Sequence, residues 1–194
     1  ILIGVIILVV GGYTLDKIIK KQDIEVGTNC PVKGISKHSV ILIDTTDNYL
    51  PVQKIWIKNQ LGKIVKATDK HEKVSVYTID ENYTDTLLPL NSQCNPGDAS
   101  NINPITGNKK MKQMSWENEF IEPLHREFNE LLNKKESSHS PIMEIIQAIS
   151  IDAFQSEIPS VERKLFIFSD MIQNTPEISH YKSSLKFKDF SDSP

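Results

Sequence analysis

Short aliphatic runs alternate with stretches of helical periodicity along most of the chain. The clearest run, SVILID at residues 39–44, is typical of a strand buried on both faces. Similar runs predict strands at residues 73–80 and 163–170, and TDTLLPL at residues 84–90 is a further candidate. Strands that alternate with helices predict an α/β fold, a three-layer sandwich with a mostly parallel central sheet.

Three amphipathic helices are predicted from the spacing of apolar residues. In the first, Val52, Ile55 and Trp56 fall at helical spacing, and Ile64 and Val65 extend the same face, which we expect to pack on the core. The second spans about residues 116–134, and Pro123 either kinks it or marks its true start.

The third helix is predicted to begin at Ser140 and Pro141. These are the residue types of an N-cap and of a first helical position. Its buried face is expected to comprise Ile142, Ile145, Ile146 and Ile149.

The N-terminal run ILIGVIILVVGGY, residues 1–13, carries no charge, and the sequence does not begin with Met. Thirteen residues are fewer than the roughly 20 that cross a bilayer, so we expect a transmembrane anchor whose upstream part belongs to a longer protein. A buried core helix and the apolar region of a signal peptide are the alternatives. The run shows no polar face and no small-x-small cleavage site.

The remaining chain is divided by composition. Residues 14–37 are predicted to form a tether and a loop leading into the domain, which spans residues 38–182. Residues 91–115 are rich in Pro, Gly, Asn, Asp and Ser and predict a long insert, of the length that is either functional or disordered. Residues 183–194 are predicted to be a flexible tail.

The side of the membrane follows from two opposing signals. Lys17, Lys20 and Lys21 after the apolar run favour the cytoplasm. Cys30 and Cys94, the two cysteines of the chain, permit one disulfide in an oxidising compartment, and two unrelated buried thiols are the alternative. We expect a single-pass membrane protein with an extracytoplasmic domain.

Oxygen-bearing side chains follow the first and last predicted strands. Asp44, Thr46 and Asn48 are alternate residues on one loop, Ser140 precedes a helix, and Asp170 ends a strand. In parallel sheets, ligands bind outside the carboxyl ends of the strands. Carboxylate, hydroxyl and amide oxygens are ligands for Mg²⁺ or Mn²⁺, and a cluster without Cys or His argues against zinc.

Each of these residues also has a purely structural interpretation. Thr46 or Asp47 could cap the helix that begins near residue 51, and Ser140 is a good N-cap by itself. Asp170 could be a turn residue at the end of a strand.

The order of these motifs resembles the von Willebrand factor A domain. That family has a first strand ending in D-x-S-x-S, a later Thr at a loop-to-helix junction, and a strand ending in Asp, which together form a metal-ion-dependent adhesion site. The resemblance assigns residues 44–48 to the first motif, Ser140 to the Thr and Asp170 to the last Asp. Asn48 replaces the second Ser of the family, and Met171 replaces a Gly.

The resemblance implies a membrane-tethered module that binds a protein partner, whose carboxylate completes the coordination of the ion. Thr46 and Ser140 would be direct ligands. Asp44 and Asp170 would act directly or through water, and Asn48 would be a ligand or an orienting group.

Two other functions remain open. In the first, the domain would be a scaffold subunit of a membrane-associated complex, with residues 91–115 as its contact surface. In the second, it would be a metal-dependent phosphohydrolase that uses Asp44. DTTD resembles the D-x-D-x-T loop of haloacid-dehalogenase phosphatases, but Thr46 stands where the second Asp should be. No phosphate loop or hydrolase motif is present, so we expect no enzyme. A net charge of −3 argues against nucleic-acid partners.

Overall fold

The structure is a computed structural model of the chain. It describes residues 23–46, 48–79, 87–100, 102–103, 107–133, 137, 139–155, 160–176 and 178–181. The predicted anchor, residues 1–13, and the predicted tail, residues 183–194, lie outside these ranges. Within them, no helix is long and apolar enough to cross a membrane.

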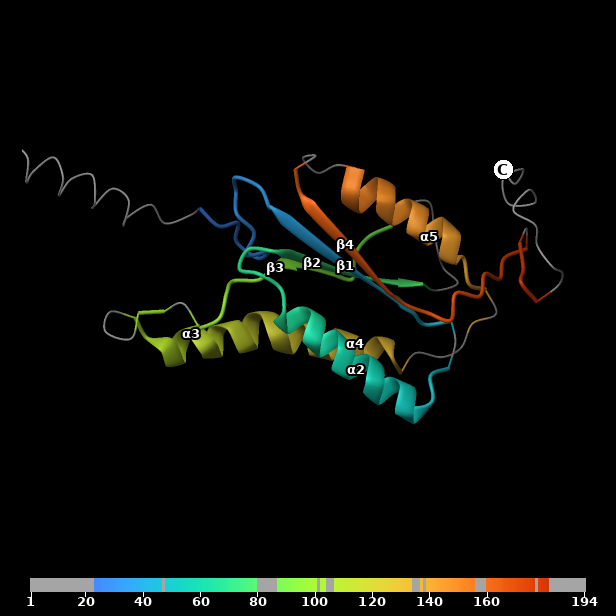
Figure 1. The fold of residues 1–194 in the computed structure, drawn as a ribbon, viewed down its shortest axis with the longest axis horizontal. Coiled ribbons are helices and arrows are strands. Elements are labelled where there is room, and N and C mark those ends of the chain that lie inside the picture. Colours follow the sequence, from blue (N-terminus) through green and yellow to red (C-terminus); the bar gives the residue numbers. More distant parts are fainter. Residues whose placement is uncertain are drawn as a thin grey trace, which may run out of the picture.

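A four-stranded sheet in the order β3-β2-β1-β4 forms the centre of the fold (Figure 1). Its strands are β1 (Lys37–Asp44), β2 (Lys73–Ile79), β3 (Asn91–Cys94) and β4 (Glu162–Phe168). Strand β1 pairs in parallel with both β2 and β4, and β3 runs antiparallel to β2. The predicted α/β fold with a mostly parallel sheet is confirmed at this level.

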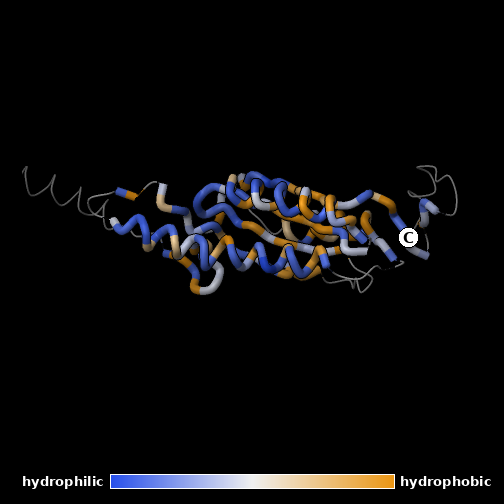
Figure 2. Tube along the Cα trace, turned by 90° about the horizontal axis from the view of Figure 1, so that it is seen from below, coloured by the Kyte–Doolittle hydropathy of each residue, from blue (hydrophilic) through white to orange (hydrophobic). Residues whose placement is uncertain are grey.

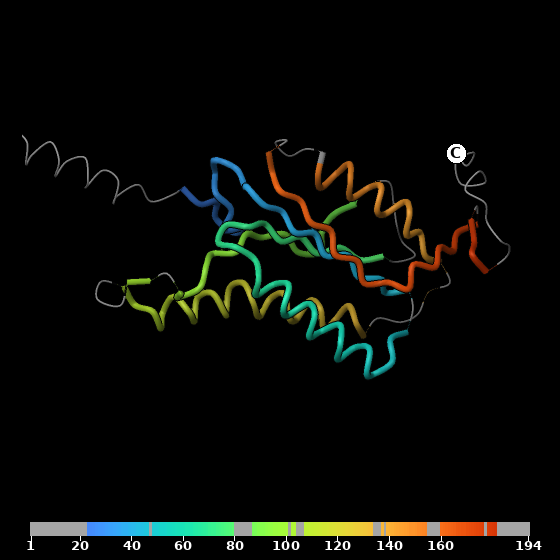
Figure 3. The backbone as a smooth tube through the Cα atoms, in the orientation of Figure 1, coloured from blue at the N-terminus to red at the C-terminus, as the bar shows by residue number. Residues whose placement is uncertain are grey.

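Helices cover both faces of the sheet, as Figures 1 and 3 show. Helix α2 (Pro51–Lys66) lies on one face together with α3 (Lys109–Trp116), the π-helical turn Glu117–Ile121 and α4 (Glu122–Leu131). Helix α5 (Ile142–Ile149) lies on the other face and continues into the π-helical turn Ser150–Gln155.

Strand β1 is buried on both faces, and its side chains alternate between two cores. Ile41 and Ile43 pack with the helices α2, α3 and α4, whereas Val40 and Leu42 pack with α5. Figure 2 shows orange, hydrophobic stretches of chain in the middle of the molecule, among mostly blue, hydrophilic helices. An unbroken aliphatic run is what a parallel strand covered on both sides requires.

The prediction of a third strand at residues 84–90 is wrong for residues 87–90, which precede β3 as irregular chain, and residues 80–86 are not described. The actual strand, Asn91–Cys94, lies in the segment that the sequence predicted to be an insert. It is an edge strand of sequence NSQC in which only Gln93 and Cys94 are buried. A polar edge strand carries no aliphatic signal.

The prediction that the second helix begins near residue 116 is also wrong. The helical chain begins at Lys109, where Asn108 caps it by accepting a hydrogen bond from the Met111 amide. Pro123 lies in the first turn of α4, directly after the π-helical turn, so its missing amide hydrogen falls where the hydrogen-bond pattern of the helical chain changes.

Over its first turns, helix α2 buries a different face from the one predicted. Ile57, Leu61 and Val65 point into the core. Val52, Ile55 and Trp56 are 69%, 63% and 59% exposed. The helix has apolar residues on two sides, and the sheet covers the side that carries Ile57, Leu61 and Val65.

A disulfide joins Cys30 to Cys94 across 64 residues of sequence. It attaches the loop before β1 to the edge strand β3. The Cys94 amide also donates a hydrogen bond to the Thr28 carbonyl at 2.7 Å. The described part of the predicted tether is therefore fixed to the sheet edge.

Replacing both cysteines, Cys30→Ala with Cys94→Ala, should lower the free energy of unfolding by about 2–4 kcal/mol, because the unfolded chain regains the entropy of an open loop. Urea denaturation measures this loss. A reductant should destabilise the wild type and leave the double variant unchanged. Equal stability of wild type and variant under oxidising conditions would contradict this role.

His38 is a buried imidazole in β1, only 1% exposed. Its Nε2 lies 2.9 Å from the Ser75 hydroxyl. Burial, followed by the positive charge of Lys73, lowers the pKa of His38 from 6.5 to about 3, and Arg163 adds to this effect. The folded protein therefore holds this imidazole neutral.

Stability should fall as the pH decreases from about 7 towards 3, because the unfolded chain then binds a proton that folded His38 refuses. At about pH 5 the loss due to His38 is about 2 kcal/mol, since one pKa unit corresponds to about 1.4 kcal/mol. Urea denaturation of the wild type and of His38→Gln at about pH 7 and about pH 5 isolates the loss of stability that is due to His38. A stability difference that stays constant with pH would show that another group is responsible.

Candidate functional site

The candidate site lies at the carboxyl end of β1, where the order of the strands reverses. From β1 the chain proceeds through α2 to β2 on one side, and it returns much later to β4 on the other side. Figure 3 shows the carboxyl ends of β1 and β4 next to each other. Ligands of open α/β sheets bind at such switch points.

Asp44 ends β1 with its carboxylate buried, 1% exposed. One oxygen, Oδ1, accepts hydrogen bonds from the Thr46 amide at 2.9 Å and from the Thr46 hydroxyl at 2.6 Å. The other, Oδ2, accepts from the Ser169 hydroxyl at 2.7 Å. Among the described residues no Lys, Arg or His pairs with this carboxylate, so its hydrogen-bond donors are a backbone amide and two hydroxyls.

The backbone around Asp44 is fixed to both neighbouring strands. The Tyr49 hydroxyl lies 2.8 Å from the Asp44 carbonyl oxygen and 3.1 Å from that of Phe168, at the end of β4. On the other side, the Thr45 hydroxyl donates to the Ile79 carbonyl at 2.9 Å, at the end of β2. The carboxylate is thus presented by a rigid framework.

The segment that contains Ser140 lies beside this framework. The Ser137 amide donates to the Thr46 carbonyl at 2.8 Å. Ser140 pairs through two backbone hydrogen bonds, of 2.8 and 3.0 Å, with Asn174, which lies beyond the end of β4. These contacts bring together the three segments that the sequence assigned to the site.

Among the described residues, none hydrogen-bonds the hydroxyl of Ser140. Ser140 is 6% exposed, and its Oγ is buried without a hydrogen bond in the part of the chain that the structure describes. The N-cap of α5 is Pro141, and the Met143 amide donates instead to the side chain of Gln173 at 3.0 Å. The interpretation of Ser140 as a helix cap is therefore wrong.

Thr46 does not cap a helix either. The N-cap of α2 is Leu50, whose amide donates to the Gln53 side chain at 2.7 Å. The Thr46 hydroxyl donates its single proton to Asp44, which leaves its oxygen lone pairs available. Asp47, the other predicted cap, lies outside the described residues.

Two of the predicted site residues lie at the rim. Asn48 and Asp170 are exposed. The Asp170 Oδ1 accepts a hydrogen bond from the Ile172 amide at 2.8 Å, so its interpretation as a turn residue is confirmed. Met171, between Asp170 and Ile172, has a φ of 63°, the left-handed conformation that favours glycine. The resembled family has a glycine at this position.

Sequence reasoning missed Ser169 and Tyr49. In the run FSDM, Ser169 directly precedes Asp170, and the sequence pattern assigned the site to Asp170 instead. The alternation of side chains along a strand was the signal available, since neighbouring residues point in opposite directions. Nothing in the local sequence pairs Tyr49 with β4.

The donor set fits a hard cation that keeps several waters. Thr46 and Ser140 offer hydroxyl oxygens, and Asp44 supplies a buried negative charge behind them. The described residues contain no cluster of three or more His, Cys, Asp or Glu side chains suited to a metal. A cation here would therefore be held by hydroxyls and water, with one carboxylate in support.

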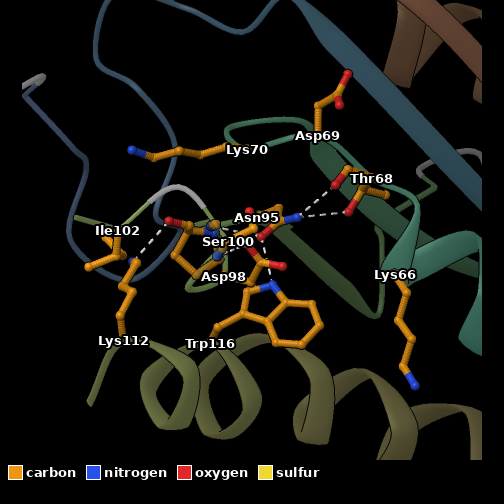
Figure 4. A pocket seen from close by; sticks show the side chains of 12 residues that line it. Lys66, Thr68, Asp69, Lys70, Asn95, Asp98, Ser100, Ile102, Lys112 and Trp116 are labelled. Carbon is orange, nitrogen blue, oxygen red and sulfur yellow. Dashed lines mark hydrogen bonds between the residues drawn. The ribbon is translucent and has the colours of Figure 1, made fainter. Parts of the chain in front are cut away.

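A cavity of about 250 Å³ lies at the opposite end of the sheet (Figure 4). Asn95 at its centre donates to Thr68 and accepts from the Trp116 indole at 2.9 Å. Lys112 donates to the Pro96 carbonyl at 2.9 Å. Asn95, Thr68, Trp116 and Lys112 are therefore already hydrogen-bonded to protein groups.

Comparison of the chain with protein-family models, with curated proteins and with solved structures finds no match, so the function is argued from this geometry.

In a buffer with chelator, Ser140→Ala should raise the free energy of unfolding by about 1 kcal/mol, because it removes a buried hydroxyl that makes no hydrogen bond. Ser169→Ala should lower it by about 1–3 kcal/mol, because Asp44 loses a donor. Urea denaturation compares the two variants. If both lose the same stability, the Ser140 hydroxyl has a structural partner and is not reserved for a ligand.

Proposed function

We propose that the protein is a binding module that holds Mg²⁺ or Mn²⁺ at the carboxyl end of its sheet and uses the ion to engage a protein partner. The observation that carries this proposal is the buried hydroxyl of Ser140, which makes no hydrogen bond within the described ranges. Such a group costs about 1–3 kcal/mol when it is left unsatisfied. A cation that accepts its lone pair gives a reason for that cost.

The position of each residue would determine its role in binding the ion. Thr46 and Ser140 would be direct ligands, and Asp44 would supply negative charge directly or through a water molecule. Asn48 and Asp170, exposed at the rim, would reach the ion through water. A carboxylate of the partner protein would take a remaining coordination position, which makes partner binding dependent on the ion.

The resemblance to the von Willebrand factor A domain supports the same function, since it assigns the ion to the motifs at Asp44, Ser140 and Asp170. The left-handed Met171 supports it further, because this backbone conformation favours glycine, the residue that the resembled family has at this position. Burial of Asp44 with hydrogen bonds to both oxygens disfavours the phosphohydrolase alternative, in which this carboxylate would attack a phosphate.

A membrane tether through residues 1–13 stays part of the proposal. The Cys30–Cys94 disulfide favours an oxidising compartment, and hence the extracytoplasmic side.

Thermal denaturation with increasing Mg²⁺ tests the ion site. The wild type should gain stability, by about 2.7 kcal/mol at a hundredfold excess over the dissociation constant, because the ion binds only the folded state. Excess chelator should abolish the gain, and Ser140→Ala and Asp44→Ala should each lack it.

The matched control is Asp98→Asn, an acid at the opposite end of the sheet, which should retain the full gain. A wild type that shows no gain, or variants at the site that gain as much as the wild type, would refute the ion site and favour the scaffold function.

A further inference from the structure

The outward face of α2 is divided along the helix axis into an apolar half and a basic half. At 100° per residue, Val52, Ile55 and Trp56 lie on the side opposite the buried Leu61. Farther along, the same side carries Asn59, Lys63 and Lys66. A helix that only had to cover its own core would place polar residues over this entire face.

The apolar half is a continuous stripe, not isolated side chains. Val52, Ile55 and Trp56 are spaced i, i+3 and i+4, and Leu50, 62% exposed, extends the stripe at the N-cap. Exposed apolar stripes that contain Trp mark sites of protein interaction. This one begins two residues from Asn48, so it adjoins the candidate ion site.

A shallow groove runs beside the stripe between α2 and α4. It has a volume of about 220 Å³ and is lined by Lys58, His125, Phe128 and Asn129. A helix laid along α2 would have room there for a side chain. Stripe and groove together have the form of a helix-binding surface.

The charge of α2 selects the occupant. The helix contains four lysines, Lys54, Lys58, Lys63 and Lys66, and no acidic residue. Among the described residues none of these lysines forms an ion pair. A partner with carboxylates would therefore meet uncompensated positive charge, whereas a second copy of this chain would bring its own lysines into the interface.

A lipid surface fits the face less well. The apolar residues occupy only the first two turns, whereas interfacial helices carry them along their whole length.

We propose that the outward face of α2 docks an amphipathic, acidic helix of a partner protein, with its apolar side chains on Val52, Ile55 and Trp56 and its carboxylates towards Lys63 and Lys66. The contact is independent of the metal ion, and it would adjoin a partner bound there.

The test uses two synthetic helical peptides in a buffer with chelator. Both carry leucine at i, i+3, i+4 and i+7; one has glutamate at its remaining positions and the other lysine. Fluorescence anisotropy should show the glutamate peptide binding at least about tenfold more tightly than the lysine peptide, with an affinity that decreases as salt increases.

Variants locate the contact. Trp56→Ser should weaken binding of the glutamate peptide by about tenfold, and Lys63→Glu with Lys66→Glu should exchange the preference between the peptides. These side chains are exposed, so the variants should fold. Val32→Ser, which changes an equally exposed apolar residue near the opposite end, is the matched control and should bind like the wild type.

Three results would overturn the proposal. Equal binding of both peptides would remove the charge selection, and equal losses in Trp56→Ser and Val32→Ser would remove the location. Binding to phosphatidylserine vesicles without peptide binding, or a dimer in solution that Ile55→Ser dissociates, would assign the face to a membrane or to a second copy. Because no ion is present, each outcome is separate from the fate of the ion site.

Discussion

The hydrogen bonds of the Asp44 carboxylate hold together the part of the structure on which function depends. They join the end of β1 to the loop through Thr46 and to the end of β4 through Ser169. A carboxylate buried to this degree is costly unless charged hydrogen bonds or a cation compensate it. The donors here are hydroxyls and one amide, which stabilise the charge without neutralising it. The site therefore retains a local negative potential at the point where the sheet opens.

The parallel core of the fold was predictable because burial on two faces produces an unmistakable aliphatic run. Strand β1 carries that signal along most of its length, whereas β2 includes polar residues and β4 is a half-buried strand at the sheet edge. The order of these strands along the chain predicts the layers. The edge strand β3 was not predictable, since NSQC forms a strand through its pairing with β2 and its disulfide, not through apolar side chains. The buried face of α2 was predicted wrongly because two apolar rows compete, and only packing against the sheet decides between them.

The site was predictable in part. The spacing of Asp44 and Thr46 is local, so the sequence shows it directly, and the fold brings Ser140 to the same end of the sheet. The contact of Ser169 with Asp44 joins residues that lie 125 positions apart, and no local pattern encodes it. That Ser140 lacks a hydrogen-bond partner in the described part of the chain also depends on tertiary structure, because the residue in isolation has every property of a helix cap. The feature that speaks most clearly for a ligand is thus one that only the folded chain shows.

The most direct test of this account is a crystal of the protein grown with Mn²⁺, in which anomalous scattering locates the ion. The account predicts an anomalous peak about 2.1 Å from the hydroxyl oxygens of Thr46 and Ser140, with waters completing an octahedron. Crystals saturated with Mn²⁺ that show no peak there, and in which the Ser140 hydroxyl binds a protein atom, would contradict it.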